Sequence, residues 1–178
     1  MSRPLLPGEY AVLGLLSLRP MHGYDMARHF ATGELAEVCP LEQPSLYTYI
    51  RNVEARGLVA WREERVGARP PRKLLDLTPA GHEALESWLR APVTRLREVR
   101  MDFLLKLYFL RQSDLAGEAA LLDAQITACE GYLAEIEHRE PANDFQALVA
   151  GSRRSAARAT IDWLVAYRDS RREVAARP

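Results

Sequence analysis

The stretch that decides the fold is residues 41–81, LEQPSLYTYIRNVEARGLVAWREERVGARPPRKLLDLTPAG. Its apolar residues first recur at helical spacing, with Leu46, Ile50 and Val53 at positions i, i+4 and i+7. One face of this helix is therefore expected to be buried in a core, and the other is expected to be exposed. Gly57 ends the helix, as glycine does where the chain needs a left-handed residue.

After this helix the apolar period changes from helical to alternating. Val59 and Trp61 alternate with polar or charged residues, and a second alternating run follows a loop at residues 67–73. Two short alternating runs around a loop predict a β-hairpin. The loop carries two prolines, which stiffen it, and three cations. Thr78 and Pro79 then cap a new helix, so the stretch has the element order of a winged helix-turn-helix.

The stretch is also locally basic, although the whole chain is neutral. The 178 residues hold 24 cations and 24 anions, a balance that argues against nucleic acid at first sight. Residues 45–73, however, carry seven arginines and lysines against three glutamates, a net charge of +4. A helix with a polar face followed by a basic hairpin suits a protein that reads a DNA groove and grips the backbone.

Several motifs of the chain resemble the PadR family of transcriptional regulators over about residues 9–88. They are Leu13-Gly14-Leu15-Leu16, His22-Gly23-Tyr24, Ser45-Leu46-Tyr47, Glu54 with Gly57-Leu58, and Leu77-Thr78-Pro79-Ala80-Gly81. The resemblance implies a repressor that binds a palindromic operator as a dimer, with an effector able to release the DNA. Two positions depart from the family. Thr48 stands where the family often has proline, which bears on base preference, and Leu75 stands where it often has an aromatic residue.

The combined pattern predicts which residues touch DNA. The helix is expected to insert Tyr47, Thr48, Arg51 and Asn52 into the major groove, where arginine suits guanine and asparagine suits adenine. Tyr24 and Ser45 are expected to hold phosphates near helix starts, and Arg69, Arg72 and Lys73 to grip the flanking backbone or minor groove. Each of these residues taken alone is more often an inert surface residue.

The second half of the chain has long helical periods. Apolar residues recur at helical spacing over residues 97–111, 121–136 and 145–167. We expect a mainly α protein with two domains, a winged helix-turn-helix over 1–90 and a helical dimerisation domain over 91–178, which also has room for an effector. Two long helices and a shorter one cannot bury all these apolar stripes alone, which favours a two-fold homodimer over a monomeric bundle.

A small-molecule effector is a further expectation. Aromatic and thioether residues near the domain junction could line a pocket, although such stripes are more often core. The candidates are Trp88, Met101, Phe103, Tyr108 and Trp163. No cofactor or metal is expected, because the four histidines and two cysteines have no ligand spacing.

The remaining features bear on location and on rival functions. No apolar run approaches the roughly 18–20 residues of a membrane helix, and we expect a cytoplasmic protein with Cys39 and Cys129 as free thiols. An enzyme is disfavoured because no phosphate loop or nucleophile elbow is present. A helical interaction module without specific DNA binding remains the alternative, although it would have no use for a stiffened cationic hairpin.

Overall fold

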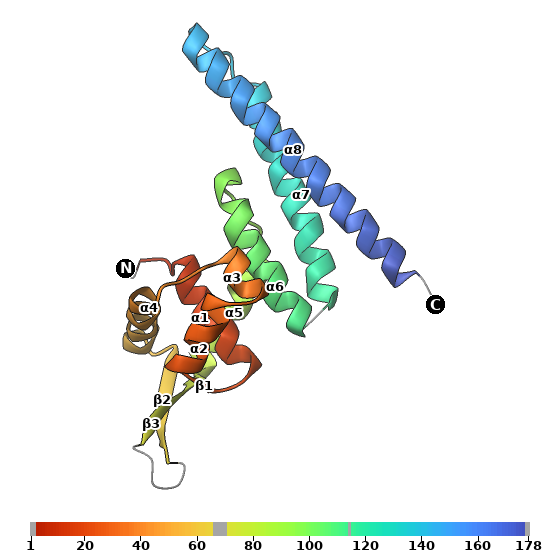
Figure 1. The fold of residues 1–178 in the computed structure, drawn as a ribbon. Coiled ribbons are helices and arrows are strands. Elements are labelled where there is room, and N and C mark those ends of the chain that lie inside the picture. Colours follow the sequence, from red (N-terminus) through yellow and green to blue (C-terminus); the bar gives the residue numbers. More distant parts are fainter. Residues whose placement is uncertain (1–2, 66–70, 114, 177–178) are drawn as a thin grey trace. The chain divides into compact units, whose positions relative to one another are not determined.

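The computed structural model describes residues 3–65, 71–113 and 115–176, and the chain forms two compact units. The first unit comprises Met1–Arg90 and Arg100–Asp114, and the second comprises Ala91–Val99 and Leu115–Pro178. The fold is mainly helical with one small antiparallel sheet, as the sequence predicts (Figure 1). The first unit has the element order of a winged helix.

Helices make up most of the first unit. They are α1 (Pro7–Leu18), α2 (Gly23–Ala31), α3 (Glu34–Val38), α4 (Gln43–Ala55), α5 (Pro79–Arg90) and α6 (Leu104–Ser113). α1 is its centre, in contact with α4, α5, α6 and β3 (Arg72–Leu77). Five of the six residues from Ala11 to Leu16 are apolar and almost fully buried, and Gly14 is the sixth. A helix that is apolar on all sides belongs in a core, which explains this central position.

α6 packs closely on α1 at Gly14. A Cβ atom added to Gly14 would lie 2.4 Å from the ring of Phe109, so only glycine allows this approach. Residues 100–113 therefore pack with the first unit, although they follow the boundary predicted at residue 90. Whether that boundary separates two functions stays a prediction.

The sheet has the strand order β1–β3–β2 and is antiparallel throughout. β1 (Met21–His22) was not predicted, and β2 (Val59–Glu64) and β3 form the predicted hairpin. The loop predicted over residues 67–73 is wrong at its end. Arg72 and Lys73 lie in β3, because they pair with Glu64 and Glu63 across the hairpin.

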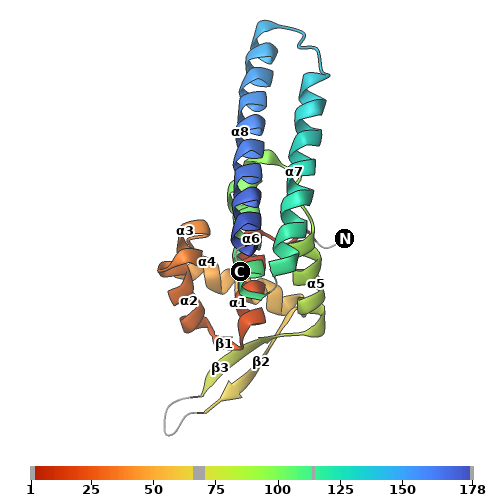
Figure 2. The same ribbon diagram turned by 90° about the vertical axis from the view of Figure 1, so that its right-hand side faces the viewer.

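The second unit is built on two long antiparallel helices, α7 (Leu115–Glu137) and α8 (Asp144–Ala175), which lie side by side (Figure 2). Asn143 caps α8, because its side-chain oxygen accepts a hydrogen bond from the Gln146 backbone N–H at 2.9 Å. The helix predicted over residues 97–111 is interrupted. A 3₁₀ turn (Leu96–Glu98) and a π-helical turn (Val99–Phe103) precede α6.

Apolar side chains of α8 remain exposed in the second unit. Phe145 is 72% exposed and Leu148 is 69% exposed, while Ala157 and Leu164 are buried. α8 therefore has an apolar surface that α7 does not cover. None of the described helices has both the length and the apolarity that crossing a membrane requires.

Candidate nucleic-acid interface

α4 is the helix expected to read DNA, and its phase is confirmed. Leu46, Ile50 and Val53 are buried at 0%, 6% and 0% exposure. Thr48 and Arg51 are exposed and lie one turn apart on the opposite side. The Arg51 guanidinium donates to the Thr48 hydroxyl oxygen at 3.1 Å, and that hydroxyl donates to a backbone carbonyl at 3.0 Å. These bonds hold the arginine along the helix surface.

Tyr47 connects the two tyrosine motifs of the sequence. A Cβ atom added to Gly23 would lie 2.9 Å from Cε1 of Tyr47, so glycine makes room for this ring at the start of α2. The group that approaches Gly23 closely is therefore the Tyr47 ring. Tyr24 follows at the same helix start and is 64% exposed, while Ser45 is exposed at the start of α4. Both helix starts therefore present exposed hydroxyls.

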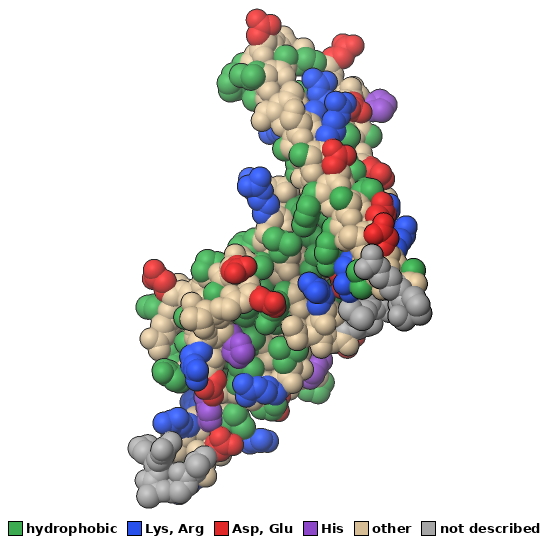
Figure 3. All heavy atoms as spheres, turned by 45° about the vertical axis from the view of Figure 1, so that its right-hand side comes forward, with side chains coloured by type: hydrophobic (Ala, Val, Ile, Leu, Met, Phe, Trp, Pro, Cys, Tyr) green, Lys and Arg blue, Asp and Glu red, His purple; other side chains and the backbone are tan. Residues whose placement is uncertain are grey.

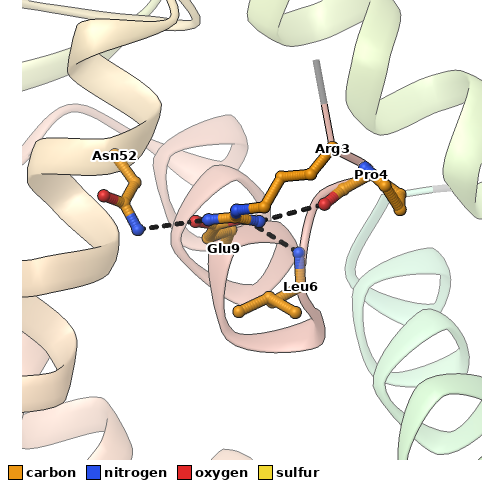
Figure 4. Close-up of polar contacts among 5 residues, drawn as sticks. All are labelled: Arg3, Pro4, Leu6, Glu9 and Asn52. Atoms are coloured by element: carbon orange, nitrogen blue, oxygen red, sulfur yellow. Dashed lines mark hydrogen bonds and ion pairs between the residues drawn. The ribbon is translucent and has the colours of Figure 1, made fainter. Parts of the chain in front are cut away.

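Asn52 is not grouped with the exposed side chains of α4. It is half-buried, and its side-chain amide donates to Oε1 of Glu9 on α1 at 2.9 Å (Figure 4). Glu9 has no exposed surface and is also bound by the guanidinium of Arg3 and by the backbone N–H of Leu6 at 2.9 Å. The structure therefore directs the amide of Asn52 towards the protein.

The environment of Glu9 favours its charged form. Burial alone would raise the pKa of this carboxyl, but hydrogen bonds from Arg3, the Leu6 backbone and Asn52 outweigh that effect and lower it. Sequence reasoning missed Glu9. The available signal was its place in the first turn of α1, two residues after Pro7, where a glutamate often accepts the N–H of the cap residue.

Two of the three cations predicted on the hairpin, or wing, loop are described, Arg72 and Lys73, and they differ in their surroundings. The Lys73 ammonium lies 4.1 Å from the centroid of the Trp61 ring and 3.8 Å from a carboxylate oxygen of Glu54 on α4. Arg72 is exposed at the start of β3 and has no ion pair with any described residue. Lys73 therefore joins the hairpin to α4, whereas Arg72 remains available. Arg69 lies outside the described residues.

His22 also fastens the hairpin. Its Nδ1 lies 2.9 Å from the Lys73 carbonyl oxygen, and its Nε2 lies 2.9 Å from a carboxylate oxygen of Glu64. The sequence motif that contains His22 thus holds β1 against both strands of the wing.

Further cations lie beside α2. A shallow hollow of about 330 Å³ is lined by Arg19, Asp25, Arg28, His29 and Thr32. Figure 3 shows blue, purple and red side chains interspersed over this unit, which are cationic residues, histidines and acidic residues. The surface of this unit therefore carries mixed charge.

The residues predicted to line an effector pocket do not form one group of exposed side chains. Phe103 is fully buried, and Met101 is 39% exposed. Trp88 stacks on Tyr10 at 4.4 Å between ring centroids, and the Lys106 ammonium lies 4.9 Å from its ring. These contacts occupy Trp88 within the first unit.

The other two candidates differ in their surroundings. Tyr108 makes an edge contact with Phe109, and Trp163 belongs to the second unit and is 41% exposed. Lys106, which sequence reasoning did not single out, is 3% exposed, and burial lowers its pKa to about 8. The effector pocket stays a prediction.

Cysteine and metal chemistry add little to the site. Cys39 and Cys129 are free and buried, and burial raises the pKa of both thiols. Within residues 3–65, 71–113 and 115–176, no group of three or more histidine, cysteine or acidic side chains could hold a metal ion. The arrangement offers polar and cationic groups for recognition.

The fold and the surface of α4 define a winged-helix protein with a helical second unit. Residues 12–87 match the model of the transcriptional regulator PadR-like family. A curated relative, the negative transcriptional regulator PadR of Bacillus subtilis (strain 168), is 25% identical over 129 residues, which cover 72% of this chain and 70% of the relative. Over residues 12–87 the chain is therefore similar to the PadR-like family of transcriptional regulators.

One solved structure has a similar fold, and a second match is weaker. The structure of Bacillus subtilis PadR in complex with operator DNA matches with a TM-score of 0.50 and 23% identity, over 94% of this chain and 99% of that one. The structure of that protein in complex with p-coumaric acid matches with a TM-score of 0.43 and 21% identity, over 94% and 97% of the two chains.

Proposed function

We propose that this chain is a transcriptional repressor that binds a palindromic operator as a homodimer. The observation that carries the proposal is the exposed edge of α4, where Thr48 and Arg51 face away from the buried side. Tyr47 is exposed on the same helix, and Tyr24 is exposed at the start of α2. A helix with a buried apolar face and such a polar edge fits the major groove. A relative named a negative regulator, and a structure of similar fold solved with operator DNA, support the assignment.

The residues take distinct roles in this proposal. Arg51 reads a base edge, with guanine the best match for a guanidinium, and the methyl group of Thr48 contacts a thymine methyl. Tyr47 enters the major groove beside these two residues, and Tyr24 and Ser45 bind phosphates near the two helix starts. Arg69 and Arg72 grip the flanking backbone, which gives affinity without sequence preference. Lys73 supports the wing through its contacts with Trp61 and Glu54.

The dimer is proposed from the second unit. Phe145 and Leu148 leave an apolar surface on α8 that a second copy can cover. A two-fold axis then sets two copies of α4 about one DNA turn apart, roughly 34 Å, which matches a palindrome. We place the protein in the cytoplasm, where it would bind its operator. Release of the DNA by a small molecule remains part of the proposal, with no pocket assigned.

A gel-shift series tests the proposal. The probes are a duplex from the promoter of the protein's own gene and a scrambled duplex of the same composition, each at rising salt. A specific regulator keeps a preference for the promoter of at least about a thousandfold as salt rises, while binding to the scrambled duplex fades. Equal binding to both duplexes at every salt concentration contradicts the proposal, and the helical interaction module then becomes the better account.

A further inference from the structure

Glu9 is a buried carboxylate whose donors come from three places in the chain. Arg3 contributes two guanidinium nitrogens, one of them at 2.8 Å, and the Leu6 backbone N–H donates at 2.9 Å. The third donor is Asn52 on α4, 43 residues away in sequence. A buried charge is tolerated only when its oxygens are bonded, so these donors are a condition of the local fold (Figure 4).

The same end of α1 also receives a tyrosine of α4. A Cβ atom added to Gly8 would lie 2.4 Å from Cε2 of Tyr49, so this ring lies directly against the first turn of α1. Tyr49 and Asn52 are three residues apart and share one edge of α4. That edge is fixed to α1 at two points, by ring packing and by a hydrogen bond to a charged group.

The fixed edge adjoins the free edge. Thr48 and Arg51 each precede a fixed residue by one position, which is about 100° around a helix of 3.6 residues per turn. A rotation of α4 about its axis would therefore move both reading side chains together. The bond from Asn52 to Glu9 opposes such a rotation, because it is the polar link between this edge and α1.

We infer that Glu9, held by Arg3, positions α4 through Asn52 and so sets the operator preference of Thr48 and Arg51 without touching DNA. This inference rests on the proposed function. It assigns Asn52 a different role from the adenine contact expected from sequence. The amide of Asn52 serves the buried carboxylate, and the N-terminal segment from Arg3 to Glu9 becomes a determinant of DNA selectivity.

The lowered pKa of Glu9 agrees with this role. A carboxylate that stays charged keeps its hold on the donors over the physiological pH range. Half of the Arg3 side chain is exposed, so its removal disturbs the link from outside the core. Arg3→Ala is therefore a milder probe than a substitution of Glu9.

A double-mutant cycle tests the inference. Affinities of the wild type, Glu9→Gln, Asn52→Ala and the double variant are measured by fluorescence anisotropy on the promoter duplex and on single-base variants of it. Each single substitution is expected to lower promoter affinity about tenfold and to blur preference at several base pairs, while the double variant is no weaker than the weaker single variant, since contacting residues are not additive. Binding to the scrambled duplex at low salt stays within about twofold.

Two further variants serve as controls for this experiment. Glu86→Gln is the matched control, because Glu86 accepts from Arg90 at 3.1 Å on the exposed surface of α5 and should leave affinity and selectivity unchanged. Arg3→Ala must blur the same base pairs as Glu9→Gln, and it keeps the test valid if the Glu9 variant fails to fold.

The possible outcomes distinguish a failure of this inference from a failure of the proposed function. A double variant near a hundredfold weaker, with lost preference confined to one base pair in the Asn52 variants, overturns the inference, because Asn52 then reads a base directly. Variants that lower the melting temperature but keep affinity and selectivity also overturn it. A wild-type protein that does not distinguish the promoter overturns the proposed function, and the inference falls with it.

Discussion

The two edges of α4 differ in how they are held, although they are one residue apart around the helix. Tyr49 packs on Gly8 and Asn52 bonds to Glu9, so this edge belongs to the interior of the unit. Thr48 and Arg51 bond only within α4 among the described residues. The difference teaches that polar residue type alone does not mark a DNA contact. The group opposite each side chain decides its role.

The largest expected effect comes from the buried apolar face of α4, which holds the whole helix, and so both of its edges, in the core. Leu46→Ala removes a side chain with no exposed surface and leaves a cavity, which should lower the free energy of unfolding by about 2–5 kcal/mol. Urea denaturation followed by circular dichroism measures it. If the loss were below about 0.5 kcal/mol, α4 would not be packed as the structure shows.

Arg51→Ala probes the free edge. Loss of a bidentate base contact should weaken promoter binding by about 1–3 kcal/mol and relax preference at one base pair, while stability changes by less than about 0.5 kcal/mol. Anisotropy titrations and a thermal melt are the two measurements. If the melting temperature fell and promoter affinity did not change, Arg51 would have a structural role and would not contact DNA, which contradicts the assigned difference between the two edges.

Acid should weaken the fixed edge selectively. The folded pKa of Glu9 is lowered from its usual 4.5, so its charged form contributes stability above pH 4.5 that is lost as the pH falls through the folded value. Glu9→Gln should therefore be less stable than the wild type by about 1 kcal/mol at pH 7, with the gap closing in acid. Denaturant curves between pH 3 and pH 7 give the result. If the difference in stability between the wild type and Glu9→Gln grew as the pH fell, the predicted direction of the pH dependence would be wrong.

The smallest expected effect is a change in the salt dependence of DNA binding, which should differ between Arg72 and Lys73 of the hairpin. Arg72→Ala should leave base preference intact and reduce the slope of log affinity against log salt by about one, as loss of one phosphate contact does. Lys73→Ala should change that slope less, because its ammonium is engaged by Trp61 and Glu54, and it should alter Trp61 fluorescence in the free protein. If both substitutions changed the salt slope equally, Arg72 and Lys73 would not differ in their contact with the DNA backbone.

Sequence reasoning predicted the winged helix because its signals are local. The spacing of Leu46, Ile50 and Val53 is set by the helical repeat, and Gly57 ends α4 with a backbone φ of +69°. The hairpin followed from alternation, but its length did not, since the pairing of Arg72 with Glu64 depends on register across the strands.

The parts that could not be predicted are contacts across long sequence distances. Asn52 meets Glu9 over 43 residues, and His22 meets Glu64 over 42. Spacing within one helix cannot reveal which neighbour lies opposite a polar side chain. Thus α4 was identified as a whole, while the division of its polar residues between interior and surface required the three-dimensional structure.

The most direct test of the central claim places a cleavage reagent on the free edge. Cys39 and Cys129 are each 3% exposed, so an iron chelate should label the introduced thiol of Thr48→Cys. A dimer that inserts α4 should then cut the promoter duplex at two clusters about 10–10.5 base pairs apart. The same label on Glu86→Cys of α5 should cut weakly. Even cutting along the duplex, or equal cutting from both positions, would contradict the account.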